Sequence, residues 1–243
     1  GVPLTHAGLL WNCAQKLRGS KGAFAHPTAG TLSLLPNFHV IGFTNNFLFN
    51  LFAGVRCAVH RDADTKPLTA DRMIDACAAL RPTVLDTVPF LAEEMIKRLD
   101  AGDPAASCLQ RLDFILAGGA PLNQTLLLPL LTRGGVRLWP HYGQTELGGP
   151  ALLGGLDGDL CAMRPPPGTR WMLVRDDGGE AMDEGELVLL GMGCATRGYL
   201  GDPNATRRLT GGLSTSTQER FHTGDVFRRA LVDGVPSTEW LGH

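Results

Sequence analysis

Residues 112–139 read LDFILAGGAPLNQTLLLPLLTRGGVRLW, and this stretch decides the fold class. It begins with a short apolar run at 112–116, passes through Gly118-Gly119, continues with a leucine-rich segment and ends with a second apolar run at 136–139. Short apolar runs bounded by glycines are typical of buried strands, and a longer leucine-rich segment between them is typical of a helix. The order strand, helix, strand predicts two parallel strands of one sheet.

The same alternation runs through the first 150 residues. We expect helices over 5–19, 38–53, 69–80 and 89–99 and from 123 onward, and strands over 31–35, 55–59, 83–88, 112–116 and 136–139. This pattern predicts an α/β fold whose mostly parallel sheet is flanked by helices on both faces. The segment 38–53 is apolar nearly all round, so we expect this helix to be buried inside the protein and to end at Gly54.

After about residue 150, glycine and proline become frequent and the apolar runs shorten. Strands are expected at 171–174, at 186–190 and around 226–228, with turns between them. This half should form a small β-rich subdomain arranged as a distorted barrel. We therefore expect two domains, residues 1–150 and residues 151–243.

The composition excludes several classes of protein. The 243 residues carry a formal net charge of −2, which argues against a surface for nucleic acid or an anionic membrane. No apolar run approaches the roughly 20 residues of a membrane-spanning helix, so no transmembrane segment is expected, and the first residues do not resemble a signal peptide. The six cysteines form no CxxC pair and no short spacing with histidines. They indicate buried thiols in a reducing compartment rather than zinc ligands or disulfides, and we expect a cytoplasmic protein.

Three short segments carry groups that suit a nucleotide. Gly118-Gly119 ends a predicted strand, and the carboxyl edge of a parallel sheet is the usual ligand crevice. The run Tyr-Gly-Gln-Thr-Glu at 142–146 offers an aromatic ring, a hydroxyl and a carboxylate suited to Mg²⁺, and Asp225 follows a Thr-Gly turn. Each segment alone also fits a plain role as a tight turn or as the start of a helix. Their order and separation favour a nucleotide site.

Eight ordered motifs make the chain similar to the adenylate-forming superfamily. This superfamily comprises acyl- and aryl-CoA synthetases, luciferases, and the adenylation domains of peptide synthetases and carboxylic acid reductases. The motifs extend along nearly the whole chain. They are Gly1-Val2 with Thr5-His6, Leu35-Pro36-Asn37-Phe38-His39 with Gly42, Arg81-Pro82-Thr83 with Val88-Pro89, Gly118-Gly119-Ala120-Pro121-Leu122, Tyr142 to Glu146, Gly185-Glu186-Leu187 with Gly191, Gly198-Tyr199, and Thr223-Gly224-Asp225.

The resemblance implies a role for each matching residue, with ATP and Mg²⁺ as cofactors. The implied adenine pocket is lined by Gly119, Ala120 and Pro121, with Tyr142 against the ring. The resemblance also implies that Thr145 contacts the α-phosphate, Glu146 binds Mg²⁺ and Asp225 binds the ribose. His39 would lie near the carboxylic acid, and Gly143 would leave room for this acid. The sequence around His39 is also compatible with a histidine that lies in the core and is hydrogen-bonded to the backbone.

The implied reaction is ATP-dependent activation of a carboxylic acid to an acyl-adenylate. The acyl group then passes to a thiol, either that of CoA or the phosphopantetheine arm of a carrier protein. Amino-acid-activating members carry an aspartate at the start of the helix after the Leu-Pro step, whereas residues 38–43 are not acidic and the next acid is Asp62. A buried ammonium group would lack its partner, so a fatty or aryl acid is favoured, with an amino acid as the alternative substrate.

Two parts of the superfamily pattern are missing from these 243 residues. The phosphate loop that ends in Pro-Lys-Gly is absent, and no lysine follows Lys97, although the superfamily's C-terminal domain supplies one to the acyl phosphate. We expect a fragment without the phosphate loop and the C-terminal domain, inactive on its own. Two alternatives remain: a catalytically incompetent nucleotide-binding fragment or pseudoenzyme, and a structural α/β scaffold in which the motifs form only turns.

Overall fold

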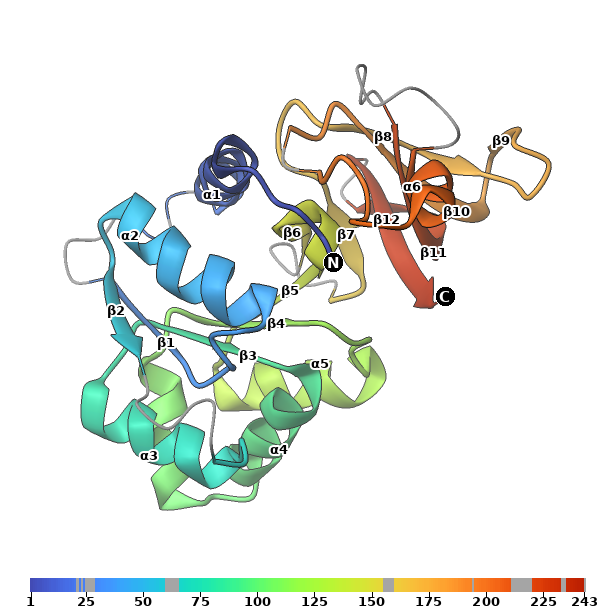
Figure 1. The fold of residues 1–243 in the computed structure, drawn as a ribbon. Helices are drawn as coiled ribbons and strands as arrows, with labels where there is room; N and C mark the ends of the chain where they lie inside the picture. The colour runs from blue at the N-terminus through green and yellow to red at the C-terminus, as the bar shows by residue number, and fades with distance from the viewer. Residues whose placement is uncertain are drawn as a thin grey trace. The chain divides into compact units, whose positions relative to one another are not determined.

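The sheet within residues 20–141 consists of parallel strands, as the sequence pattern predicts (Figure 1). The structure, a computed structural model, describes residues 1–20, 22, 24, 29–59, 66–154, 160–193, 195–210, 220–232 and 235–242. The chain divides into two compact units. We call residues 20–141 the parallel unit, and residues 1–19 together with 142–243 the antiparallel unit.

The border between the units differs from the expected domain border. The sequence predicts a single border near residue 150, whereas the units divide at residue 142. In addition, residues 1–19 group with the later part of the chain. The first helix, α1 (His6–Gly19), packs against β6 (Gly149–Gly154), where Asn12 Nδ2 donates a 2.9 Å hydrogen bond to the carbonyl oxygen of Pro150. This buried hydrogen bond joins α1 to a segment far away in the sequence.

Each strand pairing given for the parallel unit is parallel. In spatial order the strands are β2 (Arg56–Val59), β1 (Gly30–Ser33), β3 (Val84–Thr87), β4 (Phe114–Gly118) and β5 (Leu138–Gln144). Strands β1, β3 and β4 are buried along their entire length, as expected of strands covered on both faces. The α/β prediction for this half is confirmed.

Helices cover both faces of this sheet (Figure 1). On one face lie α3 (Ala70–Leu80), α4 (Pro89–Asp100) and α5 (Gln124–Gly134), and on the other lies the helix that ends in α2 (Phe49–Ala53). The 3₁₀ helix η2 (Pro104–Arg111) packs against α3 and α4. The side-chain oxygens of Thr69 and Asn123 cap α3 and α5, at the residues where the sequence predicts these helices to begin.

The helix expected over 38–53 is present, with an unexpected geometry. It consists of the π-helix η1 (Ile41–Leu48) continued by α2, and Gly54 ends it with a φ of +68°, in the left-handed conformation. Gly42 is required by close packing, because a Cβ atom there would lie 2.1 Å from the carbonyl oxygen of Pro36.

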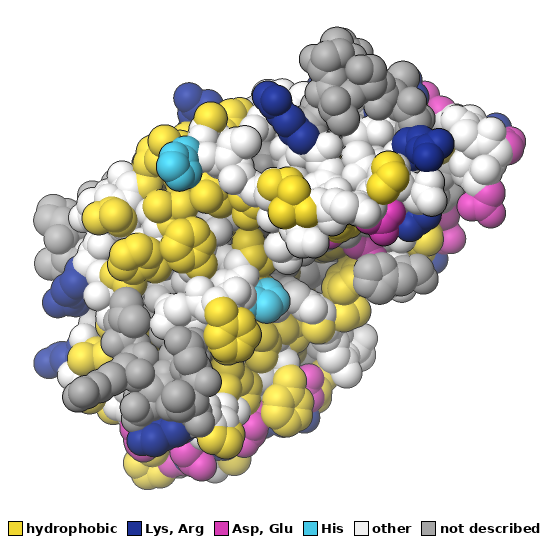
Figure 2. Space-filling view, viewed as in Figure 1, with side chains coloured by type: hydrophobic (Ala, Val, Ile, Leu, Met, Phe, Trp, Pro, Cys, Tyr) yellow, Lys and Arg dark blue, Asp and Glu magenta, His cyan; other side chains and the backbone are white. Residues whose placement is uncertain are grey.

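This helix is buried on one side only. Its buried side is mostly polar apart from Phe49, and Asn46 Oδ1 accepts a 3.2 Å hydrogen bond from Thr31 Oγ1 of β1. The other side exposes the apolar side chains of Phe43, Phe47 and Leu51, and Figure 2 shows hydrophobic side chains at the surface in this region. The prediction of burial all round is therefore wrong, because a sheet covers only one side of a helix.

The antiparallel unit contains the β-rich region that the sequence predicts after residue 150. Its strand order is β6, β7 (Ala162–Arg164), β12 (Val235–Gly242), β11 (Arg220–Val232), β10 (Glu184–Leu190), β8 (Arg170–Val174) and β9 (Glu180–Ala181). Each neighbouring pair in this order is antiparallel. The order of these described strands is linear, so the sheet is open and the expected closure into a distorted barrel is not found.

Two short helices complete the antiparallel unit. They are the 3₁₀ helix η3 (Thr145–Leu147) and α6 (Pro203–Leu209). The core of the unit is built from strand residues such as Leu173, Leu187 and Phe227, which are fully buried. None of the helices in the described part of the chain combines the length and the apolar composition that crossing a bilayer requires.

Because the helix over 41–53 is buried on one side only, we expect alanine substitutions of two of its phenylalanines to lower the free energy of unfolding by different amounts. Phe49 is 1% exposed and Phe47 is 47% exposed. We expect Phe49→Ala to lower the free energy of unfolding by about 3–5 kcal/mol, because it removes a buried aromatic side chain. Phe47→Ala should cost less than about 1 kcal/mol. Urea unfolding followed by circular dichroism measures both values, and similar losses for the two variants would contradict burial on one side only.

Candidate functional site

The segment Thr223-Gly224-Asp225 forms a bulge in the long strand β11. In the ladder between β10 and β11, Glu186 pairs with Val226 and Val188 pairs with His222. One residue of β10 therefore lies opposite the three residues of this segment. Gly224 has a φ of +74°, a conformation that glycine adopts without strain. Bulges of this kind re-aim side chains and often lie beside active sites.

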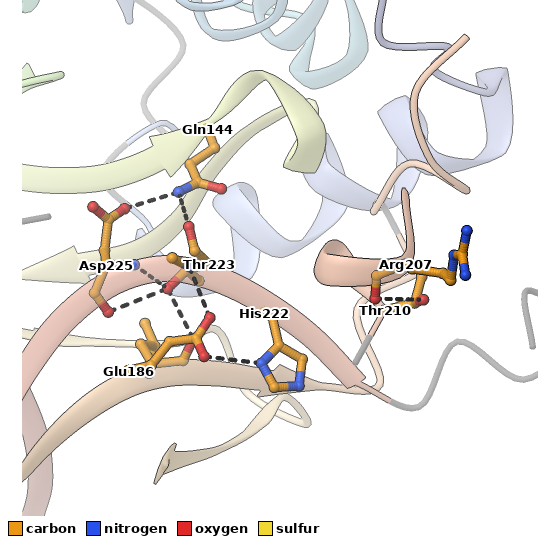
Figure 3. Close-up of polar contacts among 9 residues, drawn as sticks. Gln144, Glu186, Arg207, Thr210, His222, Thr223 and Asp225 are labelled. Carbon is orange, nitrogen blue, oxygen red and sulfur yellow. Dashed lines mark hydrogen bonds and ion pairs between the residues drawn. The ribbon is translucent and has the colours of Figure 1, made fainter. Parts of the chain in front are cut away.

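Thr223 satisfies the backbone groups that the bulge leaves without ladder partners (Figure 3). Its hydroxyl donates to the carbonyl oxygen of Leu187 at 2.8 Å, and it accepts from the N–H of Asp225 at 3.1 Å. The carbonyl oxygen of Thr223 accepts from Gln144 Nε2 at 2.7 Å. The conformation of the bulge is therefore held by side chains, as buried backbone groups require.

The carboxylate of Asp225 is buried, with the residue only 1% exposed. Its Oδ2 atom accepts from the hydroxyl of Tyr142 at 2.5 Å and from Gln144 Nε2 at 2.8 Å. Tyr142 and Gln144 are two residues apart at the end of β5, so their side chains lie on the same face of the strand. Burial raises the pKa of Tyr142 above its ordinary value, and the hydrogen bond to Asp225 and the negative charge of its carboxylate raise it further.

The aromatic ring of Tyr142 belongs to the core of the antiparallel unit. It meets Phe227 edge to face with ring centroids 5.0 Å apart, and the ring of Trp240 lies 5.7 Å away. The residue is only 4% exposed. These contacts fix the ring in place, and its stacking on a purine stays a prediction.

Glu146 lies in η3, directly after the residues that hold Asp225. Its Oε1 accepts a 2.6 Å hydrogen bond from the hydroxyl of Tyr199, and its carbonyl oxygen accepts from the N–H of Thr196. Burial, followed by the contact with Glu146, raises the pKa of Tyr199 to about 12. Thr145, the preceding residue, is exposed. The two neighbours thus differ: a carboxylate held in place by protein and a hydroxyl open to solvent.

The described residues contain no group of three or more histidine, cysteine, aspartate or glutamate side chains that could hold a metal ion by themselves. A single fixed carboxylate is nevertheless a fitting donor for Mg²⁺, which takes one or two carboxylates and completes its shell with substrate oxygens and water. Glu146 is such a carboxylate, and Tyr199 occupies a hydrogen-bonding position on one of its oxygens.

The structure explains the need for glycine at position 143 differently from the sequence-based expectation. The resemblance to the superfamily implies that Gly143 leaves room for the carboxylic acid. A Cβ atom at Gly143 would instead lie 2.3 Å from the carbonyl oxygen of Gly149, so backbone occupies that space. Gly143 is needed for this close approach of two backbone segments.

Four of the predicted site residues belong to the parallel unit. Gly119, Ala120 and Pro121 are exposed in the loop that follows β4, and Gly119 has a φ of +89°. His39 is also exposed, so the alternative of a core histidine is wrong. Its Nδ1 accepts from the N–H of Ile41 at 3.2 Å, at the start of η1.

The end of β5 in the parallel unit adds a buried histidine. His141 pairs in register with Gly118 of β4, and a Cβ atom at Gly118 would lie 2.4 Å from His141 Nε2. The Nδ2 atom of Asn45 lies 3.4 Å from the same ring nitrogen. The predicted turn after β4 is thus a site of close packing between two strand ends.

The structure brings together Tyr142 and Asp225, two of the predicted site residues from distant motifs. It also shows contacts that sequence reasoning missed, namely those of Gln144, Glu186, Tyr199 and His222. All four lie inside or beside a quoted motif, which is the signal that could have found them. The motifs themselves do not indicate which of their side chains contact one another in the folded chain.

Comparison with known proteins gives a match over most of the chain. Residues 1–200 match the family model described as AMP-binding enzyme. A 4-coumarate-CoA ligase from Narcissus pseudonarcissus is 26% identical over 253 residues, covering 93% of this chain and 41% of the ligase. An adenylate-forming reductase from Aspergillus terreus is 33% identical over 117 residues, covering 48% of this chain and 10% of the reductase. The chain thus spans less than half the length of these relatives.

Solved structures share the fold. The O-succinylbenzoate coenzyme A synthetase from Bacillus subtilis in complex with AMP aligns with a TM-score of 0.80 at 16% sequence identity. The alignment covers 100% of this chain and 46% of the synthetase. At this identity the comparison establishes the architecture, and the residue contacts described above are those of this chain.

The two tyrosines of the chain predict an unusual alkaline titration. Because both pKa values are raised, the folded chain should show little tyrosinate absorbance at pH 10, where a free tyrosine is about half ionised. The folded state binds these protons more tightly than the unfolded state. The contribution of Tyr199 to stability is therefore complete below about pH 10 and is lost as the pH rises through about 12, and the contribution of Tyr142 is likewise complete below about pH 10. Half-maximal tyrosinate absorbance in the folded chain at pH 10 would contradict the contacts of both hydroxyls.

Two variants assign the transition near pH 12. Glu146→Gln keeps an acceptor for Tyr199 but removes the negative charge, so Tyr199 should ionise at a lower pH. Tyr199→Phe should remove this transition altogether and serves as the control.

Proposed function

We propose a function that starts from a finding: this chain belongs to the family of AMP-binding enzymes. It carries the AMP-facing part of an enzyme that activates a carboxylic acid with ATP. The observation that carries the proposal is the buried contact of Tyr142 and Gln144 with the Asp225 carboxylate. This contact joins the run that continues into Thr145 and Glu146 to the late Thr-Gly-Asp turn. Groups suited to ribose, phosphate and a divalent cation are thereby linked within one unit.

Asp225 is proposed to bind the ribose. A carboxylate offers about four acceptor positions, and Tyr142 and Gln144 both donate to Oδ2. Ribose hydroxyls can add to these donors or replace one of them. Fixing the carboxylate before the nucleotide arrives lowers the entropy lost on binding.

Thr145 and Glu146 are proposed to act at the phosphate. The exposed hydroxyl of Thr145 can donate to an oxygen of the α-phosphate. Glu146 would hold Mg²⁺, which neutralises the charge of the phosphates when it is bound. Tyr199 restricts the orientation of the Glu146 carboxylate through its hydrogen bond to Oε1.

The loop after β4 is proposed to contact the adenine. Gly119, Ala120 and Pro121 expose a stretch of backbone at the carboxyl edge of the parallel sheet. Open α/β sheets bind ligands outside this edge. The positive φ of Gly119 turns the backbone there without strain, and the missing side chain lets a flat ring approach.

A fatty or aryl carboxylic acid is proposed as the substrate, with His39 near its carboxylate. Residues 29–59 contain no aspartate or glutamate that could pair with the ammonium group of an amino acid. The match to 4-coumarate-CoA ligases, whose name specifies an aryl acid, supports this choice. In the whole protein the acid's carboxylate oxygen bonds to the α-phosphorus, and pyrophosphate leaves. A thiol of CoA or phosphopantetheine then attacks the acyl carbon, and AMP leaves.

Glu146 gives a direct test of this function in the intact protein. We expect Glu146→Ala to lower the rate of acid-dependent ATP–pyrophosphate exchange by about 100-fold or more, because a group that stabilises charge in the transition state is lost. The measurement uses a panel of fatty and aryl acids, with amino acids alongside. Exchange at the wild-type rate would remove Glu146 from the proposed role, and exchange supported by amino acids alone would overturn the proposed substrate class.

Asp225→Asn should weaken ATP binding specifically. Hydrogen bonds to a charged group are worth about 1.5–3 kcal/mol, which corresponds to a rise in KM for ATP of about 10- to 100-fold. The KM for the acid should change little. Asp176→Asn, in an exposed turn of the same unit, is the matched control and should leave both constants unchanged. An unchanged KM for ATP in Asp225→Asn would contradict the ribose contact.

A further inference from the structure

Glu186 has no part in the proposed reaction, yet its carboxylate contacts the bulge on both sides of Thr223. Its Oε1 accepts from the N–H of Gly224 at 2.9 Å, and its Oε2 lies 3.0 Å from His222 Nδ1 (Figure 3). An ionised carboxylate only accepts hydrogen bonds, so the second contact requires the proton on Nδ1. One side chain of β10 therefore bridges the residues that flank Thr223.

These contacts complement those made by Thr223 and Gln144. The hydroxyl of Thr223 binds the carbonyl oxygen of Leu187, and Gln144 binds the carbonyl oxygen of Thr223. Neither reaches the N–H of Gly224, for which Glu186 is the partner. Gly224 precedes Asp225 directly and has the positive φ on which the direction of the next residue depends.

We propose that Glu186 is a positioning residue for the nucleotide: with His222 it holds the Gly224 turn so that the Asp225 carboxylate points in the direction that ribose binding needs. The inference rests on the proposed function, since it takes Asp225 as the ribose ligand. Without an acceptor at position 186, the N–H of Gly224 loses its partner and the glycine can rotate. The Asp225 carboxylate keeps its donors Tyr142 and Gln144, but the backbone that carries it is held less firmly, and binding a nucleotide must restrict it again.

A second glutamate of the same strand shows why this contact differs from an ordinary surface ion pair. Glu184 lies two residues earlier in β10 and pairs with Arg228 of β11 at 2.6 Å, with both side chains about half exposed. Ion pairs between exposed side chains contribute little to the stability of the folded state. The side chain of Glu186 is less exposed, at 31%, and one of its two partners is a backbone N–H of the bulge.

The state of Glu186 fits this role. Burial alone would raise its pKa, but the hydrogen bonds from His222 and from the Gly224 N–H outweigh burial, and the pKa lies below its ordinary value. The ionised form that accepts both hydrogen bonds is therefore the form present at neutral pH.

Three variants of the intact protein test the proposal by steady-state kinetics of pyrophosphate exchange. Glu186→Leu keeps the approximate size but removes both acceptors, so the KM for ATP should rise about tenfold, with kcat and the KM for the acid nearly unchanged. Glu186→Gln keeps an oxygen for the Gly224 N–H and can donate to the other tautomer of His222, so it should restore a KM close to that of the wild type. Glu184→Leu removes the surface pair on the same strand and should have no effect.

The outcomes separate a positioning role from a merely structural one. An unchanged KM for ATP in Glu186→Leu would overturn the proposal, as would an equal rise in Glu184→Leu. If Glu186→Gln were as impaired as Glu186→Leu, hydrogen bonding would not be the cause and the proposal would also fail.

A direct measurement distinguishes this proposal from the proposed function. Hydrogen exchange of the Gly224 amide, followed by NMR without nucleotide, should be faster in Glu186→Leu and close to the wild type in Glu186→Gln. If the amide exchanges faster, the KM for ATP is unchanged, and Asp225→Asn still raises that KM, the positioning role is wrong and the ribose contact stands. If Asp225→Asn also has no effect, the proposed function itself fails.

Discussion

The burial of the Asp225 carboxylate is the constraint on which the candidate site depends. A carboxylate is strongly disfavoured away from water unless donors lie close to it. Tyr142 and Gln144 provide such donors from the end of β5, more than 80 residues earlier in the chain. Because these donors belong to the run that continues into Thr145 and Glu146, one buried charge determines that two distant motifs meet.

The bulge in β11 is the second element of this arrangement. In a regular antiparallel ladder, backbone groups of alternate residues in the segment 223–225 would pair with β10, which lies beside β11. The bulge removes these pairings, and side chains replace them: the hydroxyl of Thr223, the amide of Gln144 and the carboxylate of Glu186. A local departure from sheet geometry is thus compatible with burial, because the buried polar groups that it frees find partners.

Two motif glycines are required by the close packing of backbone against backbone. Gly42 and Gly143 lie where carbonyl oxygens of Pro36 and Gly149 occupy the space of a side chain. A Cβ atom at either position would overlap with backbone, so each position requires glycine. The packing of backbone against backbone restricts a few positions severely, and many different side chains can fill the rest of a core.

The sequence by itself determined the alternation of strands and helices in residues 20–141, the helix starts at Thr69 and Asn123, and the turn at Gly224. These features depend on periodicity and on local hydrogen bonds, which neighbouring residues specify. Only the tertiary structure decided that Gln144 and Tyr142 hold Asp225, that Glu186 holds Gly224, and that the helix over 41–53 is buried on one side. Those outcomes depend on strand register and on which faces are covered, and both arise from contacts between residues far apart in the chain.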